Sequence, residues 1–158
     1  MFTERKPEYN DILYLSGHLR KEDVRELYLR GLTPETALKK SFTMSEYCFT
    51  VCLNNKPIAM FGAGRKEFSS GERRASIWFL GSKDIEICKP EFLKKSKRYM
   101  EFFKSKFDIL ENYIDVNNTK YIKWLKWLGF KFDEPFNIPY GQLVHFSIKK
   151  CKLRHLPY

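Results

Sequence analysis

Hydrophobic and polar positions in the first quarter of the chain follow the period of an amphipathic α-helix. Residues 11–31 read "DILYLSGHLRKEDVRELYLRG", with charged residues between the apolar ones and Gly31 as a stop signal. We expect one helix here, with a possible break around Gly17. Its apolar positions are Leu15, Leu19, Val24, Leu27 and Tyr28. Residues 33–42, "TPETALKKSF", begin with a threonine cap followed by proline and glutamate, which predicts a second, short helix.

The pattern then changes to one typical of β-strands. Residues 46–53, "EYCFTVCL", and 57–64, "PIAMFGAG", are rich in β-forming residues and flank the turn signal "NNK" at 54–56, so they predict a hairpin. A polar loop at 65–74 leads to "ASIWFLG" at 75–81. The continuous apolar character of this third strand predicts a central position with burial on both faces.

The second half of the chain alternates strands with helices. Residues 91–107 place apolar positions among lysines at a helical period, which predicts an amphipathic helix of about four turns. A strand at 109–116, a helix at 119–129, a short strand at 130–135 and a last strand at 141–150 follow. Since crossover helices return the chain to a parallel neighbour, this order after an antiparallel hairpin predicts an α/β (α+β) fold. We expect a mixed sheet of about six to seven strands, with helices on both faces.

The helix at 119–129, "TKYIKWLKWLG", has one face that should pack on the sheet. Its members are Tyr121, Trp124, Leu125 and Leu128, and the lysines that should point outward are Lys120, Lys123 and Lys126. Core packing explains most of its aromatic content. Trp127 lies off this stripe, so an exposed indole among lysines is the alternative, able to stack on an adenine or a nucleic-acid base.

Length and composition indicate one globular domain. The chain has 158 residues, 43% of them hydrophobic, which is enough for one core, so we expect residues 1–150 to form one domain and 151–158 a basic tail. No run approaches the roughly 20 apolar residues of a membrane helix, and the charged N-terminus does not resemble a signal peptide. We therefore expect a cytoplasmic protein without a membrane partner.

The four cysteines do not have the spacing of a metal site. Cys48, Cys52, Cys88 and Cys151 form no C-x-x-C pair and no histidine pattern typical of zinc. We interpret them as buried or shielded thiols in a reducing compartment, and we expect no metal.

The net charge of +10 favours a polyanionic partner. Lysines and arginines gather at 94–98, in the helix at 119–129 and in the tail. Coenzyme phosphate, nucleic acid and an acidic protein face all fit this charge. A solvated surface that keeps the protein soluble is the alternative interpretation.

The segment "VNNTKYIKWLKWLGFKF" (116–132) resembles the end of the GNAT acetyltransferase fold, in which a strand ends at Asn, a short helix follows and Gly-Phe begins the next strand. Asn118 stands eleven residues before Gly129, the spacing of that family. The ordered set "HLRKEDVREL", "GLTPETALKKS", "KPIAMFGAG", "IWFLGS", "FLKKSKRYM" and "GQLVHFSIKK" resembles, more closely, a phage family of GNAT-like proteins that includes podovirus internal virion protein A. The resemblance covers roughly residues 10–150.

This resemblance implies a sheet splayed at its centre and an acetyl-CoA site in the gap. The pantetheine amides of the coenzyme would pair with the exposed backbone of the central strand at Phe79, Leu80 and Gly81, and Asn118 would border the channel. The pyrophosphate would lie at the start of the following helix, where unpaired NH groups favour anions. Lysines that would contact it are Lys89, Lys94 and Lys95; an ordinary solvated helix face is the alternative for these three.

The chain departs from the family pattern in two places. No glycine occurs between Gly81 and Gly129, although GNAT enzymes commonly have a glycine-rich loop for the phosphates. Leu125 occupies the position at which many members have the tyrosine that protonates the leaving thiolate. Both departures would slow acetyl transfer without forbidding it.

Two residues are candidates for a general base. Asp115 ends the strand before Asn118 and would reach the mouth of the cleft, unless it caps the following turn. His18 lies in the first helical region, which borders the acceptor side in this fold, and its imidazole titrates near neutral pH. The helical charge pairs around His18 favour an exposed position instead.

Three functions from different classes follow. The first is acetyl transfer from acetyl-CoA to an amine of a protein or small molecule. The second is a GNAT-fold phage protein that has lost catalysis and acts with phage or host proteins in virion assembly or infection, located in the host cytoplasm or the virion. The third is a basic protein that binds nucleic acid. Fold similarity cannot choose between activities on its own.

Overall fold

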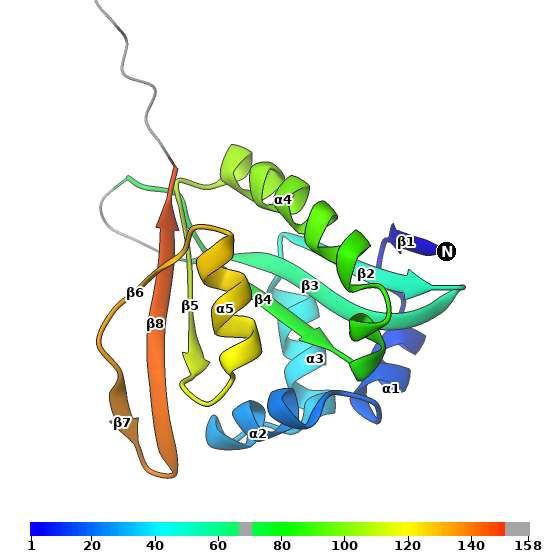
Figure 1. Ribbon diagram of the computed structural model, residues 1–158, viewed down its shortest axis with the longest axis horizontal. Coiled ribbons are helices and arrows are strands. Elements are labelled where there is room, and N and C mark those ends of the chain that lie inside the picture. Colours follow the sequence, from blue (N-terminus) through cyan, green and yellow to red (C-terminus); the bar gives the residue numbers. More distant parts are fainter. Residues whose placement is uncertain (67–70, 151–158) are drawn as a thin grey trace, which may run out of the picture.

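The computed structural model describes residues 1–66 and 71–150 of the chain. These residues form one mixed sheet in the order β1-β2-β3-β4-β5-β8-β6, with β7 paired to β8 (Figure 1). The strands are β1 (Phe2–Arg5), β2 (Tyr47–Leu53), β3 (Lys56–Lys66), β4 (Arg74–Gly81), β5 (Ile109–Asp115), β6 (Lys131–Phe132), β7 (Phe136–Ile138) and β8 (Gly141–Lys149). The helices are α1 (Tyr9–Ser16), α2 (Lys21–Leu29), α3 (Pro34–Met44), α4 (Lys89–Lys106) and α5 (Thr119–Trp127), with a 3-10 helix η1 (Lys83–Glu86) before α4. The predicted mixed α+β class is confirmed.

The sheet contains eight strands within the described residues, rather than the six to seven predicted. The two that the hydrophobic pattern missed are β1 and β7. Each is only three or four residues long, and of the β1 side chains only Phe2 is buried. A short edge strand carries too few alternating positions to show a period of two, so it is recognised only from its pairing.

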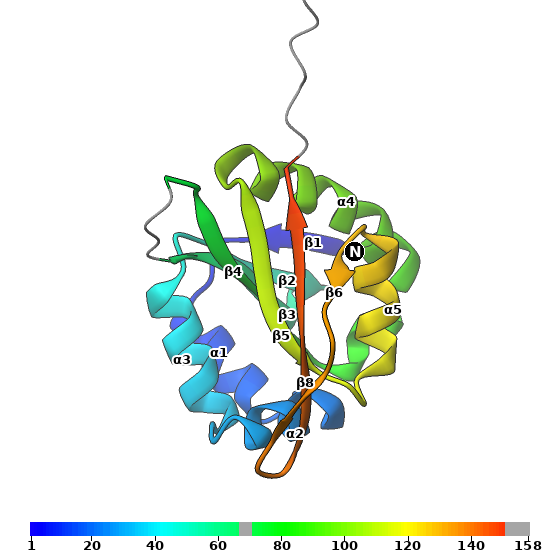
Figure 2. The same ribbon diagram turned by 90° about the vertical axis from the view of Figure 1, so that its left-hand side faces the viewer.

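The helices cover both faces of the sheet, as predicted (Figure 2). Phe92, Met100 and Phe103 of α4 pack with Leu125 of α5 on one face, in a core cluster that continues across β2, β3, β5 and β8. On the opposite face Leu15 of α1, Leu27 of α2 and Leu38 of α3 pack against Met60 and Leu80. No helix among residues 1–66 and 71–150 is both long and apolar enough to cross a membrane.

The predicted first helix is two helices, and the break falls at the anticipated Gly17. The phase predicted for its second part was wrong: Val24 is 39% exposed and Tyr28 70% exposed, whereas Asp23 and Leu27 are buried. The physical reason is a tertiary contact, because the backbone NH of Arg20 donates to the carbonyl of Gly81 at 2.9 Å. This bond fixes the start of α2 at the end of β4 and sets which side faces the sheet.

Local turn and cap signals are confirmed in detail. Asn54 and Asn55 have φ angles of 50° and 68° in the β2–β3 turn, a left-handed conformation that Asn tolerates. The Thr33 hydroxyl accepts a hydrogen bond from the NH of Thr36 and caps α3. Gly62 is required for close approach, because a Cβ atom there would lie 2.4 Å from the carbonyl oxygen of Tyr47.

Strand β4 is central, as predicted, but burial on both of its faces was only partly right. Ala75, Leu80 and Gly81 are buried, whereas residues 76–79 are only partly buried. The reason is that β5 follows β4 for three residue pairs alone, which leaves the rest of one β4 edge without a neighbouring strand.

The cysteine prediction holds where the structure describes these residues. Cys52 and Cys88 are buried and Cys48 is partly buried, and all three are free thiols. Burial raises the pKa of Cys48 to about 12. Cys151 and the predicted basic tail at 151–158 lie outside the described residues.

Candidate functional site

The central feature of the sheet is a split between β4 and β5, which are the only parallel neighbours among the described strands. Strands β4 and β5 pair at Arg74 with Ile109, Ala75 with Leu110 and Ser76 with Glu111, and no further. Beyond this point β4 continues to pair with β3, and β5 continues to pair with β8 as far as Asp115.

The apex of the split is held by a side chain. Asn112 donates from its amide nitrogen to the carbonyl oxygen of Ile77 at 2.6 Å, where the next interstrand bond would otherwise form. An unpaired backbone carbonyl is costly to bury, so this contact stabilises the point at which the strands separate.

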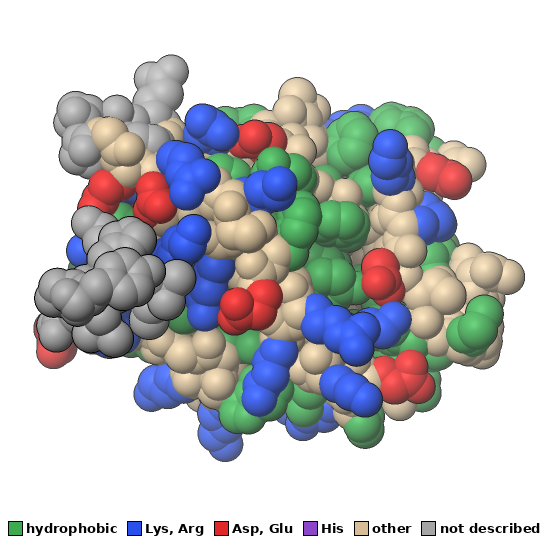
Figure 3. Space-filling view, turned by 90° about the horizontal axis from the view of Figure 1, so that it is seen from above, with side chains coloured by type: hydrophobic (Ala, Val, Ile, Leu, Met, Phe, Trp, Pro, Cys, Tyr) green, Lys and Arg blue, Asp and Glu red, His purple; other side chains and the backbone are tan. Residues whose placement is uncertain are grey.

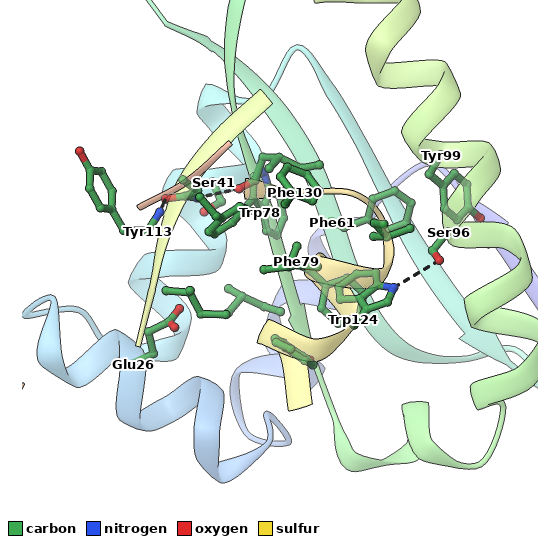
Figure 4. Close-up of a pocket in the computed structure, with 18 of the residues that line it drawn as sticks. Glu26, Ser41, Phe61, Trp78, Phe79, Ser96, Tyr99, Tyr113, Trp124 and Phe130 are labelled. Atoms are coloured by element: carbon green, nitrogen blue, oxygen red, sulfur yellow. Dashed lines mark hydrogen bonds between the residues drawn. The ribbon is translucent and has the colours of Figure 1, made fainter. Parts of the chain in front are cut away.

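A cavity of about 180 Å³ lies in this split (Figure 4). Its wall is mostly apolar and includes Phe79 and Leu80 of β4, Tyr113 of β5 and Met100 of α4. At the end near α2 the wall becomes polar, because Glu26 of that helix lines the cavity there (Figure 4). The cavity therefore reaches from the α4 and α5 side of the sheet to the α2 side.

Four aromatic rings close the space between the end of β4, α4 and α5. Phe79 lies 5.2 Å from Phe92, 5.5 Å from Tyr121 and 5.4 Å from Trp124, measured between ring centroids. Phe92 and Trp124 are 5.1 Å apart, so the rings contact one another across the two helices. The indole NH of Trp124 donates to the Ser96 hydroxyl at 3.3 Å and ties α5 to α4 (Figure 4). We call these four rings the aromatic cluster.

The last residue of β4 is closed off by α2. The NH of Gly81 donates to Asp23 Oδ2 at 3.0 Å, and its carbonyl accepts from the NH of Arg20. The guanidinium of Arg20 lies 3.7 Å from the centroid of the Tyr121 ring and 3.2 Å from Asp23 Oδ1. Burial raises the pKa of Asp23, which Arg20 and the Gly81 NH oppose. A buried polar cluster thus seals the backbone groups at this end of the split.

The turn between β4 and α4 does not have the character of a phosphate site. Residues 83–86 form η1, which buries Ile85, and Cys88 is buried at the N-cap of α4. Two carboxylates border this turn and are engaged in ion pairs, Asp84 with Lys56 at 2.8 Å and Glu86 with Lys120 at 3.3 Å. Carboxylates near a helix start oppose the binding of a further anion.

The structure brings together the predicted coenzyme residues of β4 and α5. Phe79 and Leu80 line the cavity, Gly81 follows them, and the Asn118 amide oxygen lies 3.5 Å from the buried guanidinium of Arg20. Asn118 is 2% exposed, and its amide nitrogen has no hydrogen-bond partner within the described part of the chain.

The three predicted lysines are not gathered at one point. Lys95 pairs with Glu4 at 3.0 Å and lies over the ring of Phe2, so it contacts the β1 edge of the sheet. Lys89 and Lys94 are exposed on α4.

The two predicted base candidates have structural partners. Asp115 is 1% exposed, and its carboxylate accepts a hydrogen bond from the NH of Asn117 at 3.0 Å, as expected if it caps the turn. The same carboxylate lies 3.3 Å from Nε of Arg25. His18 is exposed, stacks on Tyr14 with ring centroids 4.1 Å apart, and has Nδ1 2.6 Å from the Tyr14 carbonyl oxygen.

Sequence reasoning missed Glu26. Its side chain is 17% exposed and lines the polar end of the cavity, and burial raises its pKa to about 7. Its carboxylate accepts a hydrogen bond from the NH of Asp115 at 2.7 Å. The signal that could have found it is helical spacing. Asp23 and Glu26 are three residues apart on α2, so Glu26 lies near the side of the helix on which Asp23 and Leu27 are buried. The sequence had suggested a surface charge pair instead.

Comparison with known proteins gives two kinds of likeness. A family model described as "Bacteriophage T7, probable scaffold protein Gp13" matches residues 58–137. The probable scaffold protein gp13 of Escherichia phage T7 is 30% identical over 155 residues, which cover 95% of this chain and 99% of that protein.

Among solved structures, a GNAT-family acetyltransferase from Bacillus anthracis has a TM-score of 0.66 at 16% identity, covering 94% of this chain and 95% of its own. The aminoglycoside acetyltransferase AAC(6')-Ib, solved in complex with coenzyme A, has a TM-score of 0.66 at 16% identity, covering 95% of each chain. These structural likenesses show a GNAT fold.

Proposed function

The chain belongs to the family described as bacteriophage T7 probable scaffold protein Gp13, and from this premise we propose that it is a GNAT-fold protein that has lost acetyl transfer and acts in the assembly or infection of a phage particle. Its partners are then phage or host proteins, in the host cytoplasm or the virion. In this proposal the protein keeps the sheet and the split between β4 and β5, and the side chains of the aromatic cluster occupy part of the space that a coenzyme uses in GNAT folds.

The observation that carries this proposal is the aromatic cluster. A cavity of about 180 Å³ is smaller than the roughly 300–1,000 Å³ of pockets that hold drug-sized ligands. A coenzyme that entered the split between α4 and α5 would have to displace Phe92 and Trp124, whose ring centroids are 5.1 Å apart. A fully buried aromatic ring covers at least about 150 Å², so re-exposing one costs roughly 4 kcal/mol, which is an upper bound for Trp124 because its side chain is only partly buried. Two rings would offset most of the roughly 8 kcal/mol that a micromolar ligand supplies.

Two further features, at the end of β4 and in the turn before α4, also oppose the binding of acetyl-CoA. The NH and carbonyl of Gly81 are already paired with α2, so they are not free for pantetheine amides. The turn before α4 presents Asp84 and Glu86 rather than glycine NH groups where a pyrophosphate would lie. Each feature would separately weaken coenzyme binding.

Thermal unfolding of the full chain with and without 1 mM acetyl-CoA would test the loss of coenzyme binding. A ligand present at about 100 times its dissociation constant stabilises the folded state by about 2.7 kcal/mol, which for a chain of this size raises Tm by about 5–10 °C. We expect no shift, with an active acetyltransferase of the same fold as the positive control. A shift of several degrees would remove the proposal.

The assembly role has its own test. We expect the protein to co-purify with procapsids or virions from infected cells, and we expect a phage that lacks the gene to form defective particles. Normal infectious particles from such a phage would count against this role, whatever the result with acetyl-CoA.

Acetyl transfer to an amine is a second candidate, and Glu26 is the observation that favours it. A carboxylate with a pKa of about 7 on the wall of a cavity is suited to accept a proton near neutral pH. Asp115 and His18 are less suited, because neither side chain lines the cavity. This candidate requires the aromatic cluster to open, and the same thermal measurement separates it from the first.

A further inference from the structure

Helices α4 and α5 carry a group of exposed cations without acidic partners. The described acidic side chains are largely engaged in ion pairs with Lys and Arg residues on other elements, such as Arg5 with Asp11 and Arg73 with Asp108. By contrast, seven exposed cations of α4 and α5 have no acidic side chain within 4.0 Å among the residues that the structure describes. Two of them, Lys89 and Lys106, lie at the two ends of α4. The other five lie between these ends and on α5; they are Lys94, Lys97, Arg98, Lys123 and Lys126. We call these five residues, with Trp127, the basic face.

The two helices of the basic face lie side by side. Trp124 of α5 donates to Ser96 of α4, and Nζ of Lys97 lies 4.4 Å from the centroid of the Trp127 ring. Trp127 is 49% exposed. Viewed from the α4 side, Lys and Arg side chains spread over the surface with fewer Asp and Glu among them (Figure 3).

Acidic residues are sparse on these helices. Helix α5 has none, and α4 has only Glu91 and Glu101, of which Glu101 lies 3.7 Å from Lys104. Five cations on adjacent helices repel one another, and nothing in the core requires them there. A bound polyanion would relieve this repulsion.

The composition of the basic face favours nucleic acid over an acidic protein as the polyanion that it binds. Protein interfaces are depleted in lysine and depend on several buried aromatic, methionine and arginine anchors. The basic face has four lysines, one arginine and one exposed aromatic ring, so it lacks the apolar centre of a protein interface. Interfaces with nucleic acid are more polar and much more positively charged, and those with single strands combine a cationic track with aromatic rings for base stacking.

We propose that the basic face binds single-stranded nucleic acid without sequence preference, with phosphates on the lysines and a base on Trp127. This inference does not rest on the proposed assembly role, because the basic face lies on the outer side of α4 and α5, whereas the split lies beneath them. Single strands are favoured over duplex because a base must be unpaired to stack on an indole.

The charge count sets the expected salt dependence. Each phosphate contact to a single strand contributes about −0.7 to the slope of log affinity against log salt concentration. Five contacts give a slope of about −3.5, which is a loss of roughly a hundredfold between 50 and 200 mM salt.

The test is fluorescence anisotropy of the full chain with a labelled 20-nucleotide oligo-dT across a salt series. The double variant Lys94→Ala/Lys123→Ala should reduce the magnitude of the slope by about 1.4. The matched control Lys21→Ala/Lys40→Ala removes two exposed lysines from α2 and α3 and the same net charge, so its slope should equal that of the wild type.

Trp127→Leu separates stacking from charge. It should weaken binding at least about fivefold at every salt concentration and leave the slope unchanged. Thermal unfolding of each variant, with Tm within a few degrees of wild type, confirms that the fold is intact.

Several outcomes would overturn the proposal. Binding that does not change with salt excludes the lysine contacts, and equal losses in the test and control pairs exclude this particular face. Equal competition by poly-glutamate would indicate an acidic protein as the partner. Duplex DNA bound as tightly as oligo-dT would contradict stacking on Trp127.

Discussion

Replacing Glu26 with Gln should make the protein more stable at pH 8 and leave it unchanged, or slightly weaker, at pH 4. Burial raises the pKa of Glu26 to about 7 from the ordinary 4.5. Below about pH 4.5 the carboxyl is protonated in the folded and the unfolded chain, so it contributes no penalty. Between 4.5 and 7 the folded state binds a proton that the unfolded state has lost, and the free energy of unfolding falls as pH rises.

The size of this effect follows from the two pKa values. They differ by about 2.5, and each unit corresponds to about 1.4 kcal/mol, so the full penalty above pH 7 is about 3 kcal/mol. Gln keeps an oxygen for the NH of Asp115, and it loses only a partly exposed ion pair with Arg30 at 4.0 Å. The attraction of Arg30 already lowers the pKa of Glu26 to the value of about 7, so it is not subtracted again. We therefore expect a gain of about 3 kcal/mol at pH 8.

Urea unfolding followed by tryptophan fluorescence at pH 4, 6 and 8 measures this difference. Glu35→Gln on α3 is the matched control, because its side chain is 51% exposed, and it should stay within about 0.5 kcal/mol of wild type at each pH. If the difference between Glu26→Gln and wild type is the same at pH 4 and pH 8, Glu26 is not held in a poorly hydrated site and the reasoning fails.

Three further substitutions test the packing around the site and the fold that carries it. Trp124→Ala should lower the free energy of unfolding by about 3–5 kcal/mol in urea titrations, because it removes the ring that joins α5 to α4; a loss below 1 kcal/mol would show that the aromatic cluster is loosely packed. Gly62→Ala should cost more than about 2 kcal/mol, since its Cβ would meet the Tyr47 carbonyl, and the control Gly17→Ala, with its nearest atom at 3.9 Å, should be close to neutral. Thr33→Ala should cost about 1 kcal/mol in thermal unfolding; an unchanged Tm would mean that the cap contributes nothing to α3.

The elements that the sequence predicted well are those with local signals. The paired asparagines of the β2–β3 turn and the threonine cap of α3 act through bonds within a few residues, so their effect is visible without tertiary structure. The long amphipathic helix α4 and the exposed position of Trp127 followed from periodicity alone. The split between β4 and β5 was anticipated only from family resemblance, and the register confirms it.

The properties that the sequence could not give depend on tertiary contacts. Glu26 looked like a surface charge because its burial comes from β5 and the cavity wall, which lie far away in the chain. The aromatic rings of α5 were expected in the core, but nothing local indicated that Trp124 would contact Phe92 of α4 and that Tyr121 would contact Phe79 of β4. The roles predicted for Lys89 and Lys94 stay predictions.

The most direct test of the central claim is a crystal structure of the full chain grown or soaked with 5 mM acetyl-CoA. The account predicts that Phe92 and Trp124 remain in contact, that the Gly81 NH remains bonded to Asp23, and that no coenzyme density lies between β4 and β5. Coenzyme threaded through the split, with α4 and α5 moved apart to admit it, would contradict the account.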